Sequence, residues 1–334
     1  MRRVTLWVMA VLLLTSAQAA AQYNPYLGGK NKVRYDTFDW KVYETPHFKI
    51  SYYDRVEPQL EEIASFAESS YDELARKLNF QILKPIPMIT YATHAEFEQT
   101  NIITGFIPEG VGAFASPVRN RMVLPVDLPE RELQALIQHE LTHIFQYEIL
   151  FQGRSMRAVY RRPPLWFMEG MASYYGNDED ARDEMYMRDA TLSDQVPSVA
   201  RGFGGFLAYR YGHKVFEYIE AEWGEDVVRE FVFAFRNTFG GRIDGVFARV
   251  FNQDLEEFDA GFRTWLRQRY TAYQNRGAPG EFGRRFRAST VRRSQEISPV
   301  AAPSGDIIAA FSTYKNDADV VLFGVPDRKL YKNL

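Results

Sequence analysis

The sequence predicts an α+β protein, in which a small mixed sheet is followed by a mainly helical region and then by a short all-β segment. Three observations lead to this class. Short runs of alternating apolar residues occur between residues 47 and 126, apolar residues then recur at helical spacing up to residue 275, and alternation returns after residue 296. With 334 residues, 46% of them hydrophobic, the chain can bury a substantial core.

The N-terminus has the features of a signal peptide. Two arginines precede an apolar run at 5–14, and a small-residue stretch with Ala-x-Ala spacing follows. The run is too short to span a bilayer comfortably, which disfavours the alternative of a membrane anchor. We expect a leader at 1–21, cleaved after Ala19 or Ala21, and an N-terminal extension at 22–45.

Amino-acid composition limits which metal ligands, binding partners and cellular compartments are expected. The chain has no cysteine, so disulfides, thiolate metal ligands and a lipid-attachment cysteine are all excluded, and any metal must be held by His, Asp or Glu. The formal net charge of −3 gives no electrostatic footprint for nucleic acid. An exported chain without disulfides is expected in a bacterial periplasm or secreted fraction.

In the first half, alternation and helical periodicity predict a simple order of elements. They are a strand at 47–53, a long amphipathic helix at 56–80, a strand at 85–93, a short helix at 94–100, and two extended pieces within 111–126 joined by a turn at 117–120.

Start and stop signals define the helices of the second half. Asp127 stands three residues before Glu130, a capping-box spacing, and Pro129 is expected in the first turn. The next helix follows Pro163-Pro164, with Gly176 as its stop. Further helices are expected at 203–224, 225–239 and 254–275.

Composition changes again near the C-terminus. Residues 277–296 are rich in Gly and Arg and read as a linker, or alternatively as a basic surface for an acidic partner. The runs "IIAAFS" and "VVLFGV" beyond it predict a hairpin. One hairpin is too small for a stable domain, so 297–334 is expected to begin something larger.

The motif His139-Glu140-Leu141-Thr142-His143 lies within the helix that starts near Glu130. Histidines four residues apart share one helix face and can reach one ion, for which zinc is the usual choice. Glu140 is then placed to accept a proton from a metal-activated water. The alternative is two helix histidines without a metal, which is improbable because the chain has only 5 histidines.

A third ligand is expected on the following helix. Glu169 stands among apolar residues in "WFMEGMASYY", and an unpaired buried carboxylate there would be costly. A metal would remove that cost, whereas the alternative is a glutamate facing solvent on an amphipathic turn. Beside the histidine pair, we favour the ligand role.

"HELTH" followed by "WFMEGMASYY" resembles the gluzincin metallopeptidases, the broad thermolysin-like and aminopeptidase-like group. The resemblance implies a catalytic domain of that fold at 46–276, acting on peptide or protein substrates. It also implies site roles by position: Zn2+ held by His139, His143 and Glu169, with Glu140 as general base.

A further match concerns the oxyanion. Aminopeptidase-type gluzincins carry a Tyr-x-x-Gly stretch that opens a helix and supplies a tyrosine to the developing negative charge. Tyr209 and Gly212 have this spacing here, so the resemblance implies a catalytic Tyr209, with Tyr211 as the second candidate. The alternative is a tyrosine packed in the core.

Two differences from the gluzincin pattern limit which properties of that family the resemblance implies. The stretch from Gly112 to Ser116 lacks the Met and Asn of the aminopeptidase edge strand, so it can pair with an extended peptide but does not imply an aminopeptidase. Ser173 stands four residues after Glu169, where thermolysin-like relatives often have an acidic residue. The group that orients a zinc histidine must then come from elsewhere.

The segment from "SPVAAPSGDIIAAFS" onward resembles the opening repeat of Tol-type β-propellers. A propeller needs several blades and only about one is present, so the resemblance implies a truncated propeller and a fragment of a longer protein.

The leading hypothesis is an exported zinc-dependent peptidase, with endo- and exopeptidase modes both open. The alternatives are a non-catalytic envelope scaffold, whose propeller offers a surface to a protein partner, and a metal-dependent hydrolase acting on other substrates. The intact His-Glu-His-Glu set favours an enzyme.

Overall fold

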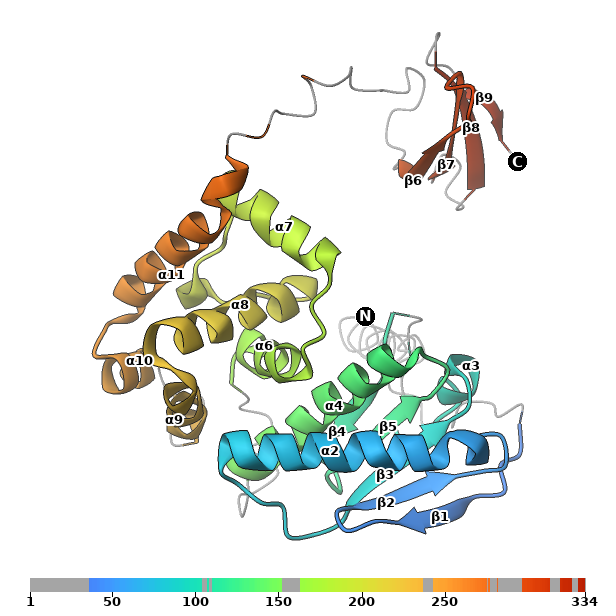
Figure 1. Ribbon diagram of the computed structural model, residues 1–334, viewed down its shortest axis with the longest axis vertical. Helices are drawn as coiled ribbons and strands as arrows, with labels where there is room; N and C mark the ends of the chain where they lie inside the picture. Colours follow the sequence, from blue (N-terminus) through green and yellow to red (C-terminus); the bar gives the residue numbers. More distant parts are fainter. Residues whose placement is uncertain are drawn as a thin grey trace, which may run out of the picture. The chain divides into compact units, whose positions relative to one another are not determined.

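The computed structural model describes residues 36–103, 107, 110–151, 163–236, 243–274, 276, 281, 296–312, 319–325 and 330–333 (Figure 1). The predicted leader and nearly all of the predicted linker lie outside these residues. Helices and two sheets together confirm the α+β class, and the chain divides into two compact units after Tyr270. Within the described part, every helix is too short or too polar to cross a membrane.

The first unit is built on a mixed five-stranded sheet with the strand order β1-β2-β3-β5-β4. Strands β2, β3 and β5 are parallel, whereas β1 and β4 are antiparallel to their neighbours at the two edges. The bounds are β1 Lys41–Glu44, β2 Phe48–Tyr52, β3 Ile86–Tyr91, β4 Phe114–Ser116 and β5 Arg121–Pro125. The predicted strands are confirmed. Strand β1 was not predicted, because it is exposed along its whole length and shows no apolar alternation.

Two helices cover one face of this sheet (Figure 1). Phe48, Ile50, Met88, Met122 and Leu124 alternate along their strands and are all buried on that face. Helix α2 (Leu60–Leu78), preceded by the 3-10 turn η1 (Glu57–Gln59), lies across it with its predicted apolar stripe buried. Helix α4 (Glu130–Phe151) packs beside α2 and against β4 and β5, so the motif helix is anchored on the sheet.

The start of α4 differs in detail from the prediction. Pro129 precedes the helix instead of lying in its first turn, and its carbonyl accepts the first helical hydrogen bond, from Leu133. The Asp127 carboxylate accepts a hydrogen bond from the backbone N–H of His94 at 3.0 Å, at the start of helix α3 (His94–Phe97). Asp127 therefore also ties the loop before α4 to α3.

The helical half follows α4. Helices α6 (Leu165–Gly176), α8 (Phe206–Trp223), α9 (Glu225–Phe235) and α11 (Leu255–Tyr270) were predicted, and α7 (Ala181–Leu192) and α10 (Asp244–Phe251) were not. Short 3-10 turns lie at η2 (Val199–Arg201) and η3 (Thr271–Tyr273). Gly176 is the last residue of α6, not its cap. Asn177, with φ of 49°, takes the left-handed position that ends the helix.

Helices α6 and α8 meet at two glycines. A Cβ atom on Gly170 would lie 2.4 Å from the backbone of Gly212, and one on Gly212 would lie 2.3 Å from the carbonyl oxygen of Trp166. No side chain fits in either place, so the two backbones are in direct contact. This contact sets the position of Glu169, on α6, relative to the residues of α8.

The second unit contains an antiparallel four-stranded meander. Its strands are β6 (Glu296–Ala301), β7 (Ile307–Ser312), β8 (Asp319–Gly324) and β9 (Leu330–Asn333), paired in that order. The predicted hairpin is confirmed as β7 and β8, and a further strand flanks it on each side. Ala310, Val321 and Phe323 form a small buried cluster on the central pair.

Candidate metal centre

Two helices bring the three expected metal ligands together. His139 and His143 lie one turn apart on α4, and Glu169 lies on α6. The Nε2 atoms of His139 and His143 are 3.7 and 3.3 Å from the same atom, Oε2 of Glu169. The histidines are buried, and the three ligand atoms all lie within 4.8 Å of one another.

The donor set suits a divalent cation. Among the described residues, Oε2 of Glu169 is buried without a well-aligned hydrogen bond, and so is Oε2 of the neighbouring Glu140. Buried carboxylate oxygens without partners are costly, and a bound cation would offset that cost. Two imidazoles and one carboxylate, with room for water, form a ligand set typical of catalytic zinc.

The candidate ligands shift one another's pKa values through their charges. Burial by itself would lower the pKa of His139, but Asp178 and Glu169 outweigh it and raise that pKa to about 10. Burial by itself would raise the pKa of Glu169, and the two histidines lower it well below its usual range.

Glu140 points from α4 toward the edge strand. Its carboxylate accepts a hydrogen bond from the backbone N–H of Ala115 on β4, and burial raises its pKa. A buried carboxyl group with a raised pKa beside two metal-ligand candidates is suited to take up and release a proton.

The two tyrosine candidates occupy different surroundings. The ring of Tyr209 lies parallel to that of His139, at 5.9 Å between centroids, and its hydroxyl lies near the Glu169 carboxylate. Burial and the nearby carboxylates raise the pKa of Tyr209, so the phenol keeps its proton and can donate it in a hydrogen bond. Tyr211 packs against Phe203 instead, at 5.3 Å. The structure therefore brings Tyr209, and not Tyr211, to the centre.

The groups that orient the histidines were missed in the sequence. Nδ1 of His139 lies 2.8 Å from Asp178, in the loop after α6, and Nδ1 of His143 lies 2.8 Å from Oε1 of Gln146. Ser173 has no carboxylate of its own, but its hydroxyl donates to Asp178. Asp178 thus supplies the acidic support that the Ser173 position lacks. Gln146, three residues after His143 on the same helix face, could have been found by spacing.

A second tyrosine flanks the other histidine. The ring of Tyr147 lies parallel to that of His143, at 6.3 Å between centroids, and its hydroxyl donates to the carbonyl of Ala115 at 3.3 Å. Each candidate ligand histidine therefore has one parallel tyrosine. Sequence reasoning did not single out Tyr147, whose spacing of four from His143 places it on the same helix face.

The centre opens into a cleft of about 890 Å³. His139, Glu140, Tyr209 and Asp178 line it, facing residues 110–113, the segment just before β4. Strand β4 ends the sheet, as expected for the stretch from Gly112 to Ser116, so one of its edges faces away from β5. The volume lies in the range of small-ligand sites.

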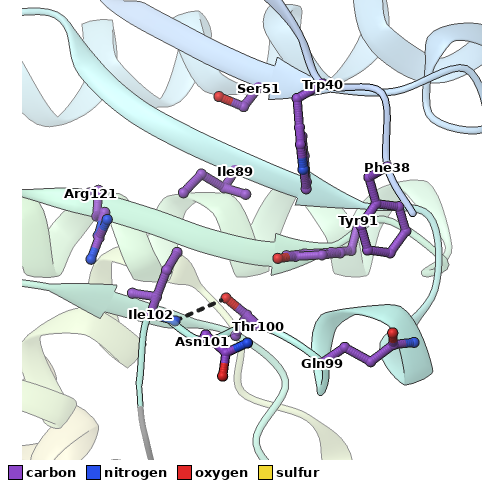
Figure 2. A pocket seen from close by; sticks show the side chains of 10 residues that line it. All are labelled: Phe38, Trp40, Ser51, Ile89, Tyr91, Gln99, Thr100, Asn101, Ile102 and Arg121. Carbon is purple, nitrogen blue, oxygen red and sulfur yellow. Dashed lines mark hydrogen bonds between the residues drawn. The ribbon is translucent and has the colours of Figure 1, made fainter. Parts of the chain in front are cut away.

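A separate hollow of about 400 Å³ lies on the opposite face of the sheet (Figure 2). The rings of Phe38, Trp40 and Tyr91 form one side of it, and Ile89 and Arg121 lie toward the other. None of the expected metal ligands lines this hollow, so the chemistry of the motif belongs to the larger cleft.

Comparison with models of known protein families finds no family that matches the chain. A search among curated proteins finds no matching protein either. The function therefore rests on the geometry of the site itself.

Proposed function

We propose that this protein is a zinc-dependent peptidase of the gluzincin type. The observation that carries the proposal is the convergence of two imidazole Nε2 atoms on one buried oxygen of Glu169, with the unpartnered oxygen of Glu140 beside them. His139, His143 and Glu169 would hold the metal ion. When bound there, zinc would polarise a substrate carbonyl and lower the pKa of a water molecule.

Side chains and backbone groups of the protein would perform the remaining steps of the reaction. Glu140 accepts the proton of the attacking water and passes it to the leaving amine, as its burial and raised pKa allow. The Tyr209 phenol donates a hydrogen bond to the oxyanion that develops on the substrate. Strand β4, at the edge of the sheet beside the cleft, is the strand along which an extended peptide would lie.

The fold supports the same proposal at a coarser level. A mixed sheet that ends in an antiparallel edge strand, followed by a mainly helical half, is the arrangement expected for a thermolysin-like domain. We further propose that the chain is exported by the leader at 1–21, and that the four-stranded meander is one blade of a β-propeller.

The test is zinc content together with cleavage of casein or a peptide library. Wild-type protein and Glu140→Gln should each bind about one zinc per chain, because Glu140 is not a ligand, while cleavage falls by roughly a thousandfold or more in the variant. Glu61→Gln, an exposed change on α2, serves as the matched control and should leave cleavage unchanged.

Two results would count against the enzyme. Absence of zinc from a folded wild-type protein would remove the metal site, and activity unaffected by Glu140→Gln would remove the base. Zinc binding without any peptide cleavage would favour the alternatives, a binding or scaffold protein or a hydrolase of non-peptide substrates.

A further inference from the structure

A series of hydrogen-bonded, buried polar groups leads from His139 into the helical half of the molecule. Nδ1 of His139 lies 2.8 Å from Oδ2 of Asp178, and the other oxygen of Asp178 accepts the hydroxyl proton of Ser173. The same Ser173 oxygen lies 3.0 Å from Nδ1 of His213, on α8. Ser173 and His213 are both buried, and neither lines the cleft.

The direction of each hydrogen bond in this chain is fixed by chemistry. An ionised carboxylate only accepts, so both His139 and Ser173 donate to Asp178. Ser173 has a single hydroxyl proton, already directed at Asp178, so His213 must donate to Ser173 through Nδ1. With Nδ1 of His139 engaged as a donor, Nε2 is the nitrogen whose lone pair is left for a metal.

The far end of the chain is anchored by a fully buried lysine. Nε2 of His213 lies 3.4 Å from Glu217. The ammonium group of Lys214, 0% exposed, lies 2.6 Å from Glu179, 2.7 Å from Glu184 and 2.9 Å from Glu217. Removing one partner from such a buried network leaves an uncompensated charge, so the arrangement resists rearrangement.

This anchor has a second attachment on α11. Arg269 and Tyr270 bind Glu184 at 2.9 and 2.7 Å, which connects α7, α8 and α11 at one point. Glu179, His213 and Glu217 are close enough to suggest a second metal site. However, the Lys214 ammonium already lies between the two carboxylates, so we read the cluster as a structural anchor.

We propose that Ser173 and His213 are positioning residues, which hold Asp178 and through it orient His139 toward the metal. The inference rests on the proposed function, because it assigns a purpose to groups around that metal centre. It distinguishes His139 from His143, whose support by Gln146 ends at the backbone carbonyl of Met168.

The first test measures zinc affinity by competition with a chromophoric chelator. Ser173→Ala removes one hydroxyl and should weaken zinc binding by about tenfold, the lower end of what groups behind a ligand contribute. Ser70→Ala is the matched control: Ser70 is also a buried helix serine, and its hydroxyl has no hydrogen-bond partner among the described residues. An affinity within about twofold of that control would overturn the proposal.

The second test is a double-mutant cycle with Asp178→Ala. If Ser173 acts through Asp178, then Ser173→Ala should change affinity by less than about twofold in the Asp178→Ala background. His213→Gln should behave in the same way, and the visible spectrum of the cobalt-loaded protein should shift in each single variant. Unfolding midpoints of all variants separate loss of orientation from loss of folding.

The outcomes separate the two proposals. A folded wild-type protein that binds no zinc would defeat the proposed function. A wild-type protein that binds zinc, together with additive effects of Ser173→Ala and Asp178→Ala, would defeat this inference alone.

Discussion

The two histidines of the motif lie on the same helix, α4, but their Nδ1 atoms are hydrogen-bonded to groups of different charge. His139 is held by the carboxylate of Asp178, at the end of a charged network that reaches α11. His143 is held by the neutral amide of Gln146, which in turn donates to the Met168 carbonyl at 2.8 Å. One ligand thus has charged support and the other has neutral support.

We infer from this difference that the two positions would affect a bound metal in different ways. The charged group behind His139 would set the electrostatics of the site, and the neutral group behind His143 would fix the geometry. A carboxylate behind His139 raises the basicity of the ring and responds to nearby charges. An amide behind His143 fixes the ring orientation without adding charge. Changes to the charged side should therefore affect metal affinity and acid sensitivity more than matched changes to the neutral side.

The largest difference is expected between the two flanking tyrosines. Tyr209→Phe should lower kcat by about a hundredfold to a thousandfold, since the phenol proposed to stabilise the oxyanion is lost. Tyr147→Phe should lower kcat by less than about threefold, because that hydroxyl is directed at the Ala115 carbonyl. Steady-state kinetics with a peptide substrate measure both. Equal losses of kcat in Tyr209→Phe and Tyr147→Phe would show that the two tyrosines contribute equally to the reaction.

The next comparison replaces the groups behind the histidines. Asp178→Asn should weaken zinc binding by about ten- to a hundredfold, and Gln146→Ala by less than about tenfold, because a hydrogen bond to a charged acceptor is the stronger one. Chelator competition at fixed ionic strength measures both affinities. A greater loss in Gln146→Ala would reverse the assignment of charged and neutral support.

The smallest effect concerns acid. Burial by itself would raise the pKa of Glu184 and Glu217. Hydrogen bonds with Lys214 at Glu184, and with His213 and Lys214 at Glu217, outweigh it and lower both pKa values from 4.5 to about 2. Because their folded-state pKa values are depressed, the stability they contribute is present above pH 4.5 and is lost as the pH falls toward 2.

Thermal unfolding measured over that range checks this expectation. Glu217→Gln should show a shallower loss of unfolding temperature with acid than the wild type, because one of the two titrating groups is gone. The exposed change Glu61→Gln should follow the wild-type curve. Identical curves for all three proteins would mean that the anchor does not respond to acid.

The proximity of the three candidate ligands was predictable from the spacing of residues along the sequence. A capping signal and an apolar stripe placed His139 and His143 on one helix face, and the apolar surroundings of Glu169 marked that carboxylate as unusual. Asp178 was not predictable, because it reaches His139 only through the left-handed turn at Asn177.

A weak amphipathic pattern explains why helix α7 was not predicted. Helix α7 buries only Asp183, Met187 and Thr191, so it has almost no apolar stripe. Its capping box, formed by Asp180 and Asp183, was nevertheless readable from the sequence. The chain of polar groups from Ser173 to His213 depends on the approach of α6 to α8, and no local pattern reports that approach.

The contact of Gly170 with Gly212 has a consequence for how the centre is assembled. The backbone contact of α6 with α8 fixes the position of Glu169 relative to Tyr209. Helix α4 alone would offer the proposed metal ion two imidazoles, a weaker ligand set than one that includes Glu169. Tight binding of that ion would therefore require α6 to be docked as well as the motif helix to be formed.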